Sequence, residues 1–496
     1  MKTLIWFRGK DLRVSDHPAF EHATNQALMV FVLDPAYFTP DRAQTRPHRM
    51  QYLVESLLAL EQRIADLGGK LWFVAGRSAD VIPKLAKAAS VDQVVAMRWA
   101  EPFGRKRDGQ LARALEVPLV LLEGETLLPP GSIRSQADTP YTVFSPFARR
   151  FRSQFELKSR GVEPAELSRV ALPDGFKSVP CPTLGSLGLV RNSGLVKGGE
   201  QEAKGRLALF LEQSAHSYSD LRNRLDFSGT SRISADLKFG VLSVRQVWAA
   251  VMESSLSEAE KTCFTNELIW REFNYSTMWD HPDILGMPFK RKWKDFPWKR
   301  DRDLLGLWKA GLTGYPVVDA ASRQLLATGF VHNRARMVAA SFLTKHLLLD
   351  YRLGESHYLR WLTDGDWAQN SMGWQWAAGC GADAQPWFRI FNPVTQGKKF
   401  DPNGDYVRRW VPELSGVDAK YIHSPWEAPQ RALEWAGVHL GETYPEPVVD
   451  HRQARERFLR TAKAFFSDQP VMSEEGTSST SFGGSGDEFP ATSQPA

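Results

Sequence analysis

The segment Asp364–Trp376 reads DGDWAQNSMGWQW and combines polar side chains with tryptophan. If the residues after Gly365 are helical, Asp366, Asn370 and Trp374 follow one another at four-residue intervals and share one helix face. A buried carboxylate or amide is costly unless it is hydrogen-bonded, so this face needs a partner. These residues alone leave two alternatives open: a satisfied polar network within the core, or a site for a bound polar ligand.

A second motif lies upstream, in YSDLRNRLDFSGTSRIS (residues 218–234). Thr230 and Ser231 precede Ser234, which we predict to be the N-cap of a helix beginning at Ala235. Backbone N–H groups, hydroxyls and a neighbouring arginine there would form a cradle for phosphate. Ordinary helix capping is the alternative.

A third set of residues is divided between two predicted helices. An aromatic ring for stacking, an amide and a carboxylate for base edges, and arginine for phosphate suit nucleic-acid recognition. Taken singly, however, Trp270 is more typical of a core residue and Arg334 of a surface residue. The residues are Glu267, Trp270 and Arg271 on the first helix and Asn333, Arg334 and Met337 at the start of the second.

The N-terminal and C-terminal halves of the chain differ in composition. Of the 17 tryptophans, 13 lie between Trp270 and Trp435. The net charge of +5 is modest and typical of ordinary solvated surface, but residues 289–300 (FKRKWKDFPWKR) interleave six basic with four aromatic residues. That pattern is typical of a nucleic-acid surface.

Patterning divides the 496 residues into four parts, as expected for a chain too long for one core. Residues 1–130 contain the strand-like runs 3–7, 28–34, 70–76, 92–98 and 118–124, separated by helix-length segments, which predicts βαβ units around a parallel, Rossmann-like sheet. The first run is not followed by GxGxxG. We expect a connector over 131–202, an all-helical domain over 203–466 and a disordered tail over 467–496.

Several classes of protein find no support in the composition. No run approaches the roughly 18 apolar residues of a membrane span, and a charged turn follows the first strand, so we expect a cytoplasmic protein that does not enter a membrane. The three cysteines (Cys181, Cys263 and Cys380) are far apart, which argues against disulfides, zinc and iron–sulfur clusters. We expect no metal site.

Together these motifs resemble the photolyase and cryptochrome family in order and spacing. The resemblance runs from IWFRGKDLRVSDHP near the start to about Phe466 and includes NELIWREF (266–273), TGYPVVDAASRQL (313–325), HNRARMVAASFL (332–343) and FRIFNPVTQGKKFDP (388–402). It is closest to the bacterial cyclobutane-dimer photolyases. It implies an α/β antenna domain followed by a helical domain that binds FAD.

The resemblance also implies the FAD contacts. Arg336 is expected to pair with Asp364 beside the flavin ring. Asn370 is expected to face flavin N5, where an amide favours the repair branch over the cryptochromes. The residues implied to bind FAD are Tyr218, Thr230, Ser231, Ile233, Ser234, Arg271, Asn333, Arg336, Asp364, Asp366 and Asn370.

The implied reaction is light-driven repair of cyclobutane pyrimidine dimers in ultraviolet-damaged DNA. Excited reduced FAD passes one electron to a dimer flipped out of the duplex, the cyclobutane ring splits, and the electron returns. The (6-4) photolyases have paired histidines where this chain has His332 and Asn333, so the cyclobutane dimer is the expected substrate. The implied dimer contacts are Glu267, Trp270, Asn333, Arg334, Met337 and Trp376.

Two positions depart from the family pattern. The photoreducing relay usually has three tryptophans; Trp374 and Trp298 match the inner and outer members, but the middle position is Tyr351. Slower photoreduction, or a detour through Trp361 or Trp367, is therefore expected. Members that bind a folate antenna have glutamate where this chain has Gly104, so folate is in doubt and a deazaflavin, another chromophore or none stays open.

Two rival functions stay open at this stage. A cryptochrome-like blue-light photoreceptor would use the same scaffold, with the tail as a signalling extension. A nucleotide-binding α/β protein with a helical interaction domain would have no flavin absorption band. The resemblance also implies a monomer.

Overall fold

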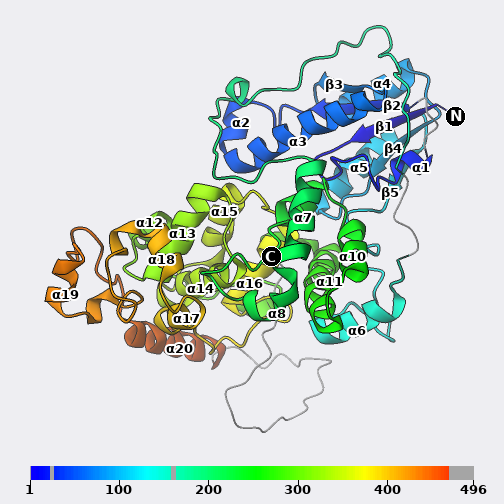
Figure 1. Cartoon of the computed structure of the whole chain (residues 1–496). Coiled ribbons are helices and arrows are strands. Elements are labelled where there is room, and N and C mark those ends of the chain that lie inside the picture. Colours follow the sequence, from blue (N-terminus) through cyan, green and yellow to red (C-terminus); the bar gives the residue numbers. More distant parts are fainter. Residues whose placement is uncertain (1, 23–26, 158–162, 468–496) are drawn as a thin grey trace.

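The computed structural model describes residues 2–22, 27–157 and 163–467. An α/β domain is followed by a helical domain, and the two lie against each other in Figure 1. The predicted fold class is confirmed. Among the described residues, no helix is both long and apolar enough to span a membrane. The tail predicted over 467–496 lies outside the described residues except for Ser467.

All five predicted strand runs form strands of one parallel sheet. Their order across the sheet is β3-β2-β1-β4-β5, so the connections change direction between β1 and β4. The strands are β1 (Thr3–Phe7), β2 (Ala27–Leu33), β3 (Leu71–Ala75), β4 (Gln93–Met97) and β5 (Leu119–Leu122).

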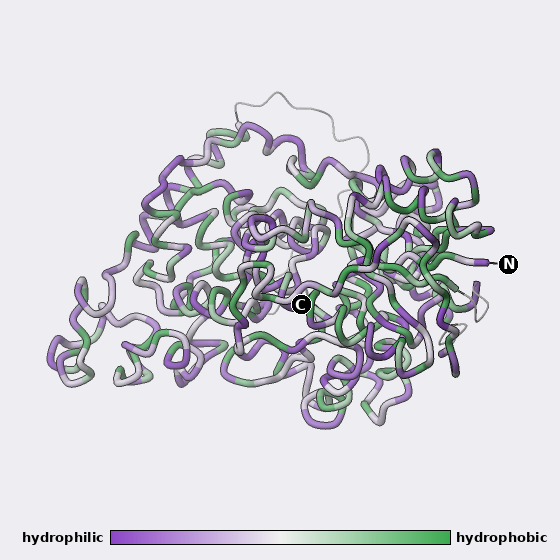
Figure 2. Tube along the Cα trace, turned by 90° about the horizontal axis from the view of Figure 1, so that it is seen from above, coloured by the Kyte–Doolittle hydropathy of each residue, from purple (hydrophilic) through white to green (hydrophobic). Residues whose placement is uncertain are grey.

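The sheet is covered on both faces, as the continuous apolar runs require. Alternate residues of β1 point to opposite sides: Ile5 and Phe7 share a core with the α3 residues, and Leu4 and Trp6 share one with α4 and α5. The core on the α3 side continues into the helical domain. The hydrophobic stretches of the α/β domain run through its interior in Figure 2. The domain's helices are α1 (Ala19–His22), α2 (Pro40–Gln44), α3 (Pro47–Asp66), α4 (Ser78–Ala88) and α5 (Pro102–Ala114).

The rest of the described chain is helical apart from its connections. The bounds are α6 (Phe144–Gln154), α7 (Glu200–Gln213), α8 (Tyr218–Leu221), α9 (Ser234–Phe239), α10 (Val244–Glu253), α11 (Glu258–Asp280), α12 (Arg302–Ala310), α13 (Pro316–Thr328), α14 (Asn333–Ser341), α15 (Tyr351–Trp361), α16 (Trp367–Ala378), α17 (Pro393–Phe400), α18 (Asp405–Trp410), α19 (Gln430–Trp435) and α20 (His451–Ser467). A π-helical turn, Phe342–His346, extends α14.

Helix α6 lies inside the segment expected to be a connector. Its Phe147 ring packs edge-on against Phe273 of α11, with ring centroids 5.2 Å apart. This contact explains why the segment is ordered here, because α6 buries an apolar face against the longest helix of the helical domain. Part of the segment between the two sequence domains therefore belongs to the helical core.

Candidate functional site

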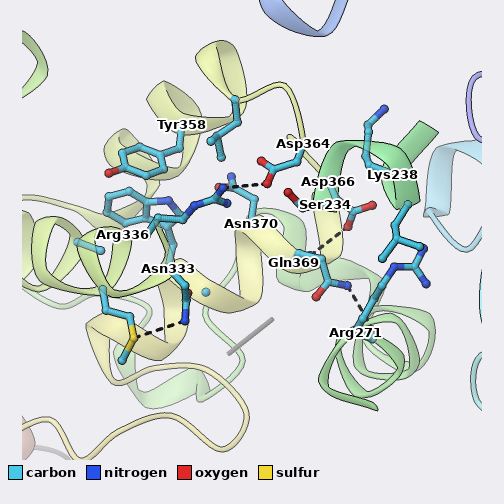
Figure 3. Close-up of a pocket in the computed structure, with 16 residues that line it drawn as sticks. Ser234, Lys238, Arg271, Asn333, Arg336, Tyr358, Asp364, Asp366, Gln369 and Asn370 are labelled. Carbon is cyan, nitrogen blue, oxygen red and sulfur yellow. Dashed lines mark hydrogen bonds and ion pairs between the residues drawn. The ribbon is translucent and has the colours of Figure 1, made fainter. Parts of the chain in front are cut away.

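A cavity in the helical domain brings together side chains from α9, α11, α14, α15, α16 and the loop before α16 (Figure 3). Nine of the residues predicted from the sequence line it: Ser234, Arg271, Asn333, Arg336, Met337, Asp364, Asp366, Asn370 and Trp374. The sequence patterns do not single out the other lining residues, which are Leu237, Lys238, Ala340, Tyr358, Leu362, Gln369 and Gly373.

Helix α16 carries the polar face expected from the sequence. Asp366 is its N-cap, and the carboxylate accepts a hydrogen bond from the Gln369 N–H at 3.1 Å. Asn370 and Trp374 follow on the same face and line the same cavity. The Asn370 Nδ2 donates to the Glu355 carbonyl at 3.0 Å. This leaves the Asn370 Oδ1 as the acceptor that a ligand's N–H can use.

Arg336 and Asp364 form the expected ion pair, 2.8 Å apart. Arg336 also donates to the Val331 carbonyl at 2.7 Å, which fixes the guanidinium. The second oxygen of Asp364, Oδ1, is buried and has no hydrogen-bond partner among the described residues. A buried acceptor without a partner is costly, so this atom suits a ligand donor such as the flavin ring supplies. The lining residues fit FAD by this test.

The predicted N-cap role of Ser234 is wrong. Helix α9 begins at Ser234 itself, and Ile233 occupies the N-cap position without a side-chain cap. The physical reason is the backbone of Arg232, the residue before Ile233. Its φ of 53° is left-handed, and the chain turns there, so that Ser234 is already helical. The Ser234 side chain is thereby directed to the cavity lining instead of to the helix end.

A second group of predicted residues meets beside this cavity, where α8, α11 and α14 approach one another. Glu267 forms an ion pair with Arg222, 2.8 Å apart. The sequence patterns did not identify Arg222. Arg334 donates to the Asn223 Oδ1 at 2.7 Å and lies over the Phe400 ring. Burial and the nearby Arg222 lower the pKa of Arg334 to about 10. Arg222 and Arg334 therefore lie near each other, and Arg222 also pairs with the Glu267 carboxylate. Two neighbouring guanidiniums favour an anionic partner such as phosphate.

His332 has a structural part in the same region. It is the N-cap of α14, and its Nδ1 accepts from the Arg334 N–H at 3.1 Å. Burial, with the nearby arginines, lowers the pKa of His332 to about 3, so the imidazole is neutral and keeps this acceptor at neutral pH.

The two tryptophans expected to stack on a substrate are both buried. Trp270 is 3% exposed and Trp376 is 5% exposed. The Trp270 ring lies flat on Phe144 of α6, with centroids 3.7 Å apart and planes 5° from parallel. One face of the Trp270 indole is therefore covered by Phe144 of α6, a helix in the segment expected to be a connector.

The rings in direct contact with Trp374 are two that the relay implied by the family does not include. Among the described residues, the ring contacts of Trp374 are with Tyr358 at 5.1 Å and Trp308 at 5.9 Å. Tyr351 is buried, and its hydroxyl has no hydrogen-bond partner in the part of the chain that the structure describes. Burial raises the pKa of Tyr351 above its ordinary value. Within the described residues, its hydroxyl therefore has no acceptor in place for the proton that tyrosine loses on oxidation.

The other aromatic residues considered for the relay have different neighbours. Trp298 packs on Phe296 and Trp293, with ring centroids 4.4 and 6.1 Å away. Trp361 packs on His48 and Trp367 on Phe103. Neither Trp361 nor Trp367, the two proposed detours, has a ring contact with Trp374 within the described residues.

Four residues expected to bind FAD lie outside the cavity lining, on α8 or just before α9: Tyr218, Thr230, Ser231 and Ile233.

A second cavity, of about 600 Å³, lies at the carboxyl ends of the strands and against the helical domain. Its aromatic lining includes Trp6, Trp99 and Trp367, and seven of its lining residues are basic against two acidic. The Arg8 Nε and Nη2 and the Trp99 Nε1 are buried donors without a partner among the described residues. This is the place in an open parallel sheet where ligands bind, next to the change of direction between β1 and β4.

Lys238 of α9 lines both cavities, so the two cavities are neighbours. Burial, followed by the charges of Arg49 and Lys10, lowers the pKa of Lys238 to about 7.

Comparison with known proteins agrees with this geometry. The family model for the FAD binding domain of DNA photolyase matches residues 264–464, and the model for DNA photolyase matches residues 3–168. A deoxyribodipyrimidine photo-lyase of Thermus thermophilus is 38% identical over 465 residues, which cover 93% of this chain and 98% of the relative. The chain belongs to the DNA photolyase family. Its helical domain is the FAD-binding domain of that family.

Solved structures of the photolyase family extend the match. A class III photolyase from Agrobacterium tumefaciens aligns with a TM-score of 0.87 at 35% identity, covering 94% of this chain and 98% of that one. A cryptochrome from Synechocystis aligns with a TM-score of 0.82 at 28% identity, covering 93% of this chain and 99% of that one. A photolyase from Sulfolobus tokodaii with two FAD molecules aligns with a TM-score of 0.79 at 26% identity, covering 94% of this chain and 100% of that one. The scaffold is therefore shared by repair enzymes and a cryptochrome.

Proposed function

We propose that this photolyase repairs cyclobutane pyrimidine dimers in ultraviolet-damaged DNA under blue light. One observation carries the proposal: a single cavity is lined both by Asp364, Asp366 and Asn370, expected to contact the flavin, and by Asn333 and Met337, expected to contact the dimer. An electron donor and acceptor held in one cavity are close enough for direct transfer. When bound, reduced FAD supplies the electron that splits the dimer and takes it back afterwards.

The protein's part is to bind, orient and exclude water. Arg336 and Asp364 would hold the polar edge of the flavin ring, and the Asn370 Oδ1 would be an acceptor for the N–H of its reduced form without adding charge. Arg222 and Arg334 attract the DNA phosphates beside the cavity, and Glu267, which pairs with Arg222, accepts from a base edge.

The proposal is tested with reduced protein and an oligonucleotide that contains one thymine dimer. Blue light is expected to restore thymine absorbance, whereas a dark control and a sample lacking protein remain unchanged. A (6-4) photoproduct in the same sequence context is expected to persist. Absence of light-dependent recovery of the thymine dimer, in protein that contains reduced FAD, would favour the photoreceptor function instead.

The photoreceptor alternative rests on the likeness to the Synechocystis cryptochrome. Asn370 argues against it, because its neutral amide suits the reduced flavin that repair requires. The expected monomer is also a proposal, and sedimentation of the holoprotein tests it.

Trp270→Ala is expected to weaken binding of dimer-containing DNA at least tenfold while leaving the flavin spectrum unchanged. Trp270 lies outside the flavin cavity lining, so FAD contacts survive its removal. Binding is measured by fluorescence anisotropy with damaged and undamaged oligonucleotides, and the undamaged one reports the nonspecific component. Loss of FAD from the variant would instead make Trp270 a support of the flavin site.

For the second cavity we propose a planar chromophore that carries negative charge, of the flavin or deazaflavin type. Its aromatic walls suit a ring system and its excess of basic residues suits phosphate or an ionised ring. Gly104 argues against a folate held by glutamate at this position. A side-chain Cβ on Gly104 would lie 2.8 Å from the Trp99 side chain, which itself lines the cavity.

Mass spectrometry of the chromophores released from the purified protein tests this assignment. FAD together with a second flavin or deazaflavin would support it. A folate in stoichiometric amount would overturn it.

A further inference from the structure

The loop after β1 carries a lysine into the boundary between the two domains. Lys10 is 6% exposed, and its ammonium contacts the carboxylates of Glu101 and Glu125 within the α/β domain. On the other side it lies 3.6 Å from the Asp366 Oδ2 and 3.4 Å from the Tyr275 hydroxyl, both in the helical domain. A single side chain therefore joins the α/β domain to a residue of the flavin cavity.

The Lys10 ammonium balances the negative charge of three buried carboxylates. Oxygens of Glu101, Glu125 and Asp366 lie within 4.8 Å of one another, and all three residues are at least 90% buried. Burial raises the pKa of Glu101 to about 7, although Lys10 opposes the rise. Burial alone would also raise the pKa of Asp366, but Lys10 first, then the Tyr275 hydroxyl and Arg271, reverse this effect and the pKa is lowered. Without the ammonium, three buried carboxylates would repel one another.

Asp366 is fixed from three directions. Its Oδ1 accepts from the Gln369 N–H, which caps α16, and its Oδ2 accepts from the Tyr275 hydroxyl at 2.5 Å. Lys10 approaches the same Oδ2 from the α/β domain. The orientation of this carboxylate in the cavity, and the start of the helix that carries Asn370 and Trp374, thus depend on a group outside the FAD-binding domain.

The Lys10 loop is itself held against helix α9, which borders the cavity. Gly240, the C-cap of α9, has a φ of 60°, and a Cβ there would collide with the Lys10 carbonyl. The Leu12 N–H donates to the Phe239 carbonyl at 3.2 Å. The loop backbone is therefore locked in place, and Lys10 projects from a fixed support.

We propose that Lys10 is a positioning residue of the flavin site, which holds the Asp366 carboxylate in the orientation that binds FAD. The α/β domain thereby completes the cofactor site of the helical domain. This inference rests on the proposed placement of FAD beside Asp366, and it is independent of which DNA lesion is repaired.

The test is the rate at which FAD leaves the holoprotein after dilution, followed by the fluorescence of free flavin. Lys10→Met, which keeps the side-chain length without the charge, is expected to speed release at least tenfold. Lys70→Met is the matched control, because Lys70 also pairs with a glutamate, Glu61 at 2.7 Å, but is partly exposed and lines neither cavity. Its release rate is expected to equal that of the unmodified protein.

The double variant Lys10→Met/Glu125→Gln separates positioning from charge balance. It removes one positive and one negative charge, so the melting temperature is expected to recover toward that of the unmodified protein. FAD release is expected to stay fast, because Asp366 still lacks its ammonium. Release at the unmodified rate in the double variant, or in Lys10→Met itself, would overturn the proposal. These measurements involve neither DNA nor the repair reaction, so a failure of dimer repair in the unmodified protein would leave their outcome unaffected.

Discussion

A Gly354→Ala variant is expected to lose most of its bound FAD and to unfold at a lower temperature. Gly354 is buried in α15, and a Cβ at this position would collide with the Trp374 ring and lie 2.7 Å from the Leu343 side chain. Both neighbours are themselves buried, so neither can yield without disturbing the core. Overpacking of this kind costs about 1 to 3 kcal/mol, and here it also moves a residue that lines the flavin cavity.

The measurements are the ratio of flavin to protein absorbance and the melting temperature. Gly306→Ala in α12 is the matched control, because a Cβ there has no heavy atom within 4 Å and its φ is not left-handed. It is expected to stabilise the protein by about 0.4 to 1 kcal/mol through the unfolded state. A Gly354→Ala protein with full FAD content would show that Trp374 can shift without cost to the site.

Arg336→Met is the second change with a large expected effect, a release of FAD at least tenfold faster than from the unmodified protein. It leaves the Asp364 carboxylate, whose side chain is 6% exposed, without its cation. Breaking a fully buried ion pair lowers the free energy of unfolding by about 3 to 5 kcal/mol. A loss of about 2 to 3 kcal/mol is expected here, because the Arg336 side chain is 22% exposed. Release is followed by flavin fluorescence and stability by denaturant unfolding.

Two further variants define what the Arg336 result means. Arg452→Met breaks the exposed pair with Glu456 on α20 and is expected to change neither measurement. Arg336→Met/Asp364→Asn removes both charges, so stability should recover while FAD release stays fast. If the double variant also regained FAD, the pair would serve the fold alone.

The sequence predicts best what local spacing determines. The five strands follow from apolar runs of strand length, because a parallel sheet covered on both faces needs such runs. The shared face of Asp366, Asn370 and Trp374 follows from the period of one helix. The predicted N-cap of α9 was wrong by one residue: the helix begins at Ser234, and Ile233 is the N-cap. The left-handed backbone at Arg232 explains the earlier start.

Contacts between distant segments could not be predicted in this way. Arg222 pairs with Glu267, and Lys10 approaches Asp366, only because the helices and the sheet bring them together. For Phe144 a signal was present: Phe144, Phe147, Phe151 and Phe155 recur every three or four residues, which is typical of an amphipathic helix. Which residue that face would cover, Trp270, depends on the tertiary fold.

The core on the α3 side of the sheet has a consequence for how the chain folds. Because its side chains run without interruption from Ile5 and Phe7 to Val247 and Phe273, neither domain can complete its hydrophobic interior alone. The two domains are therefore expected to unfold in one cooperative transition, although the chain is long enough for two. Separate expression of residues 1–130 would leave that apolar face uncovered and prone to aggregation.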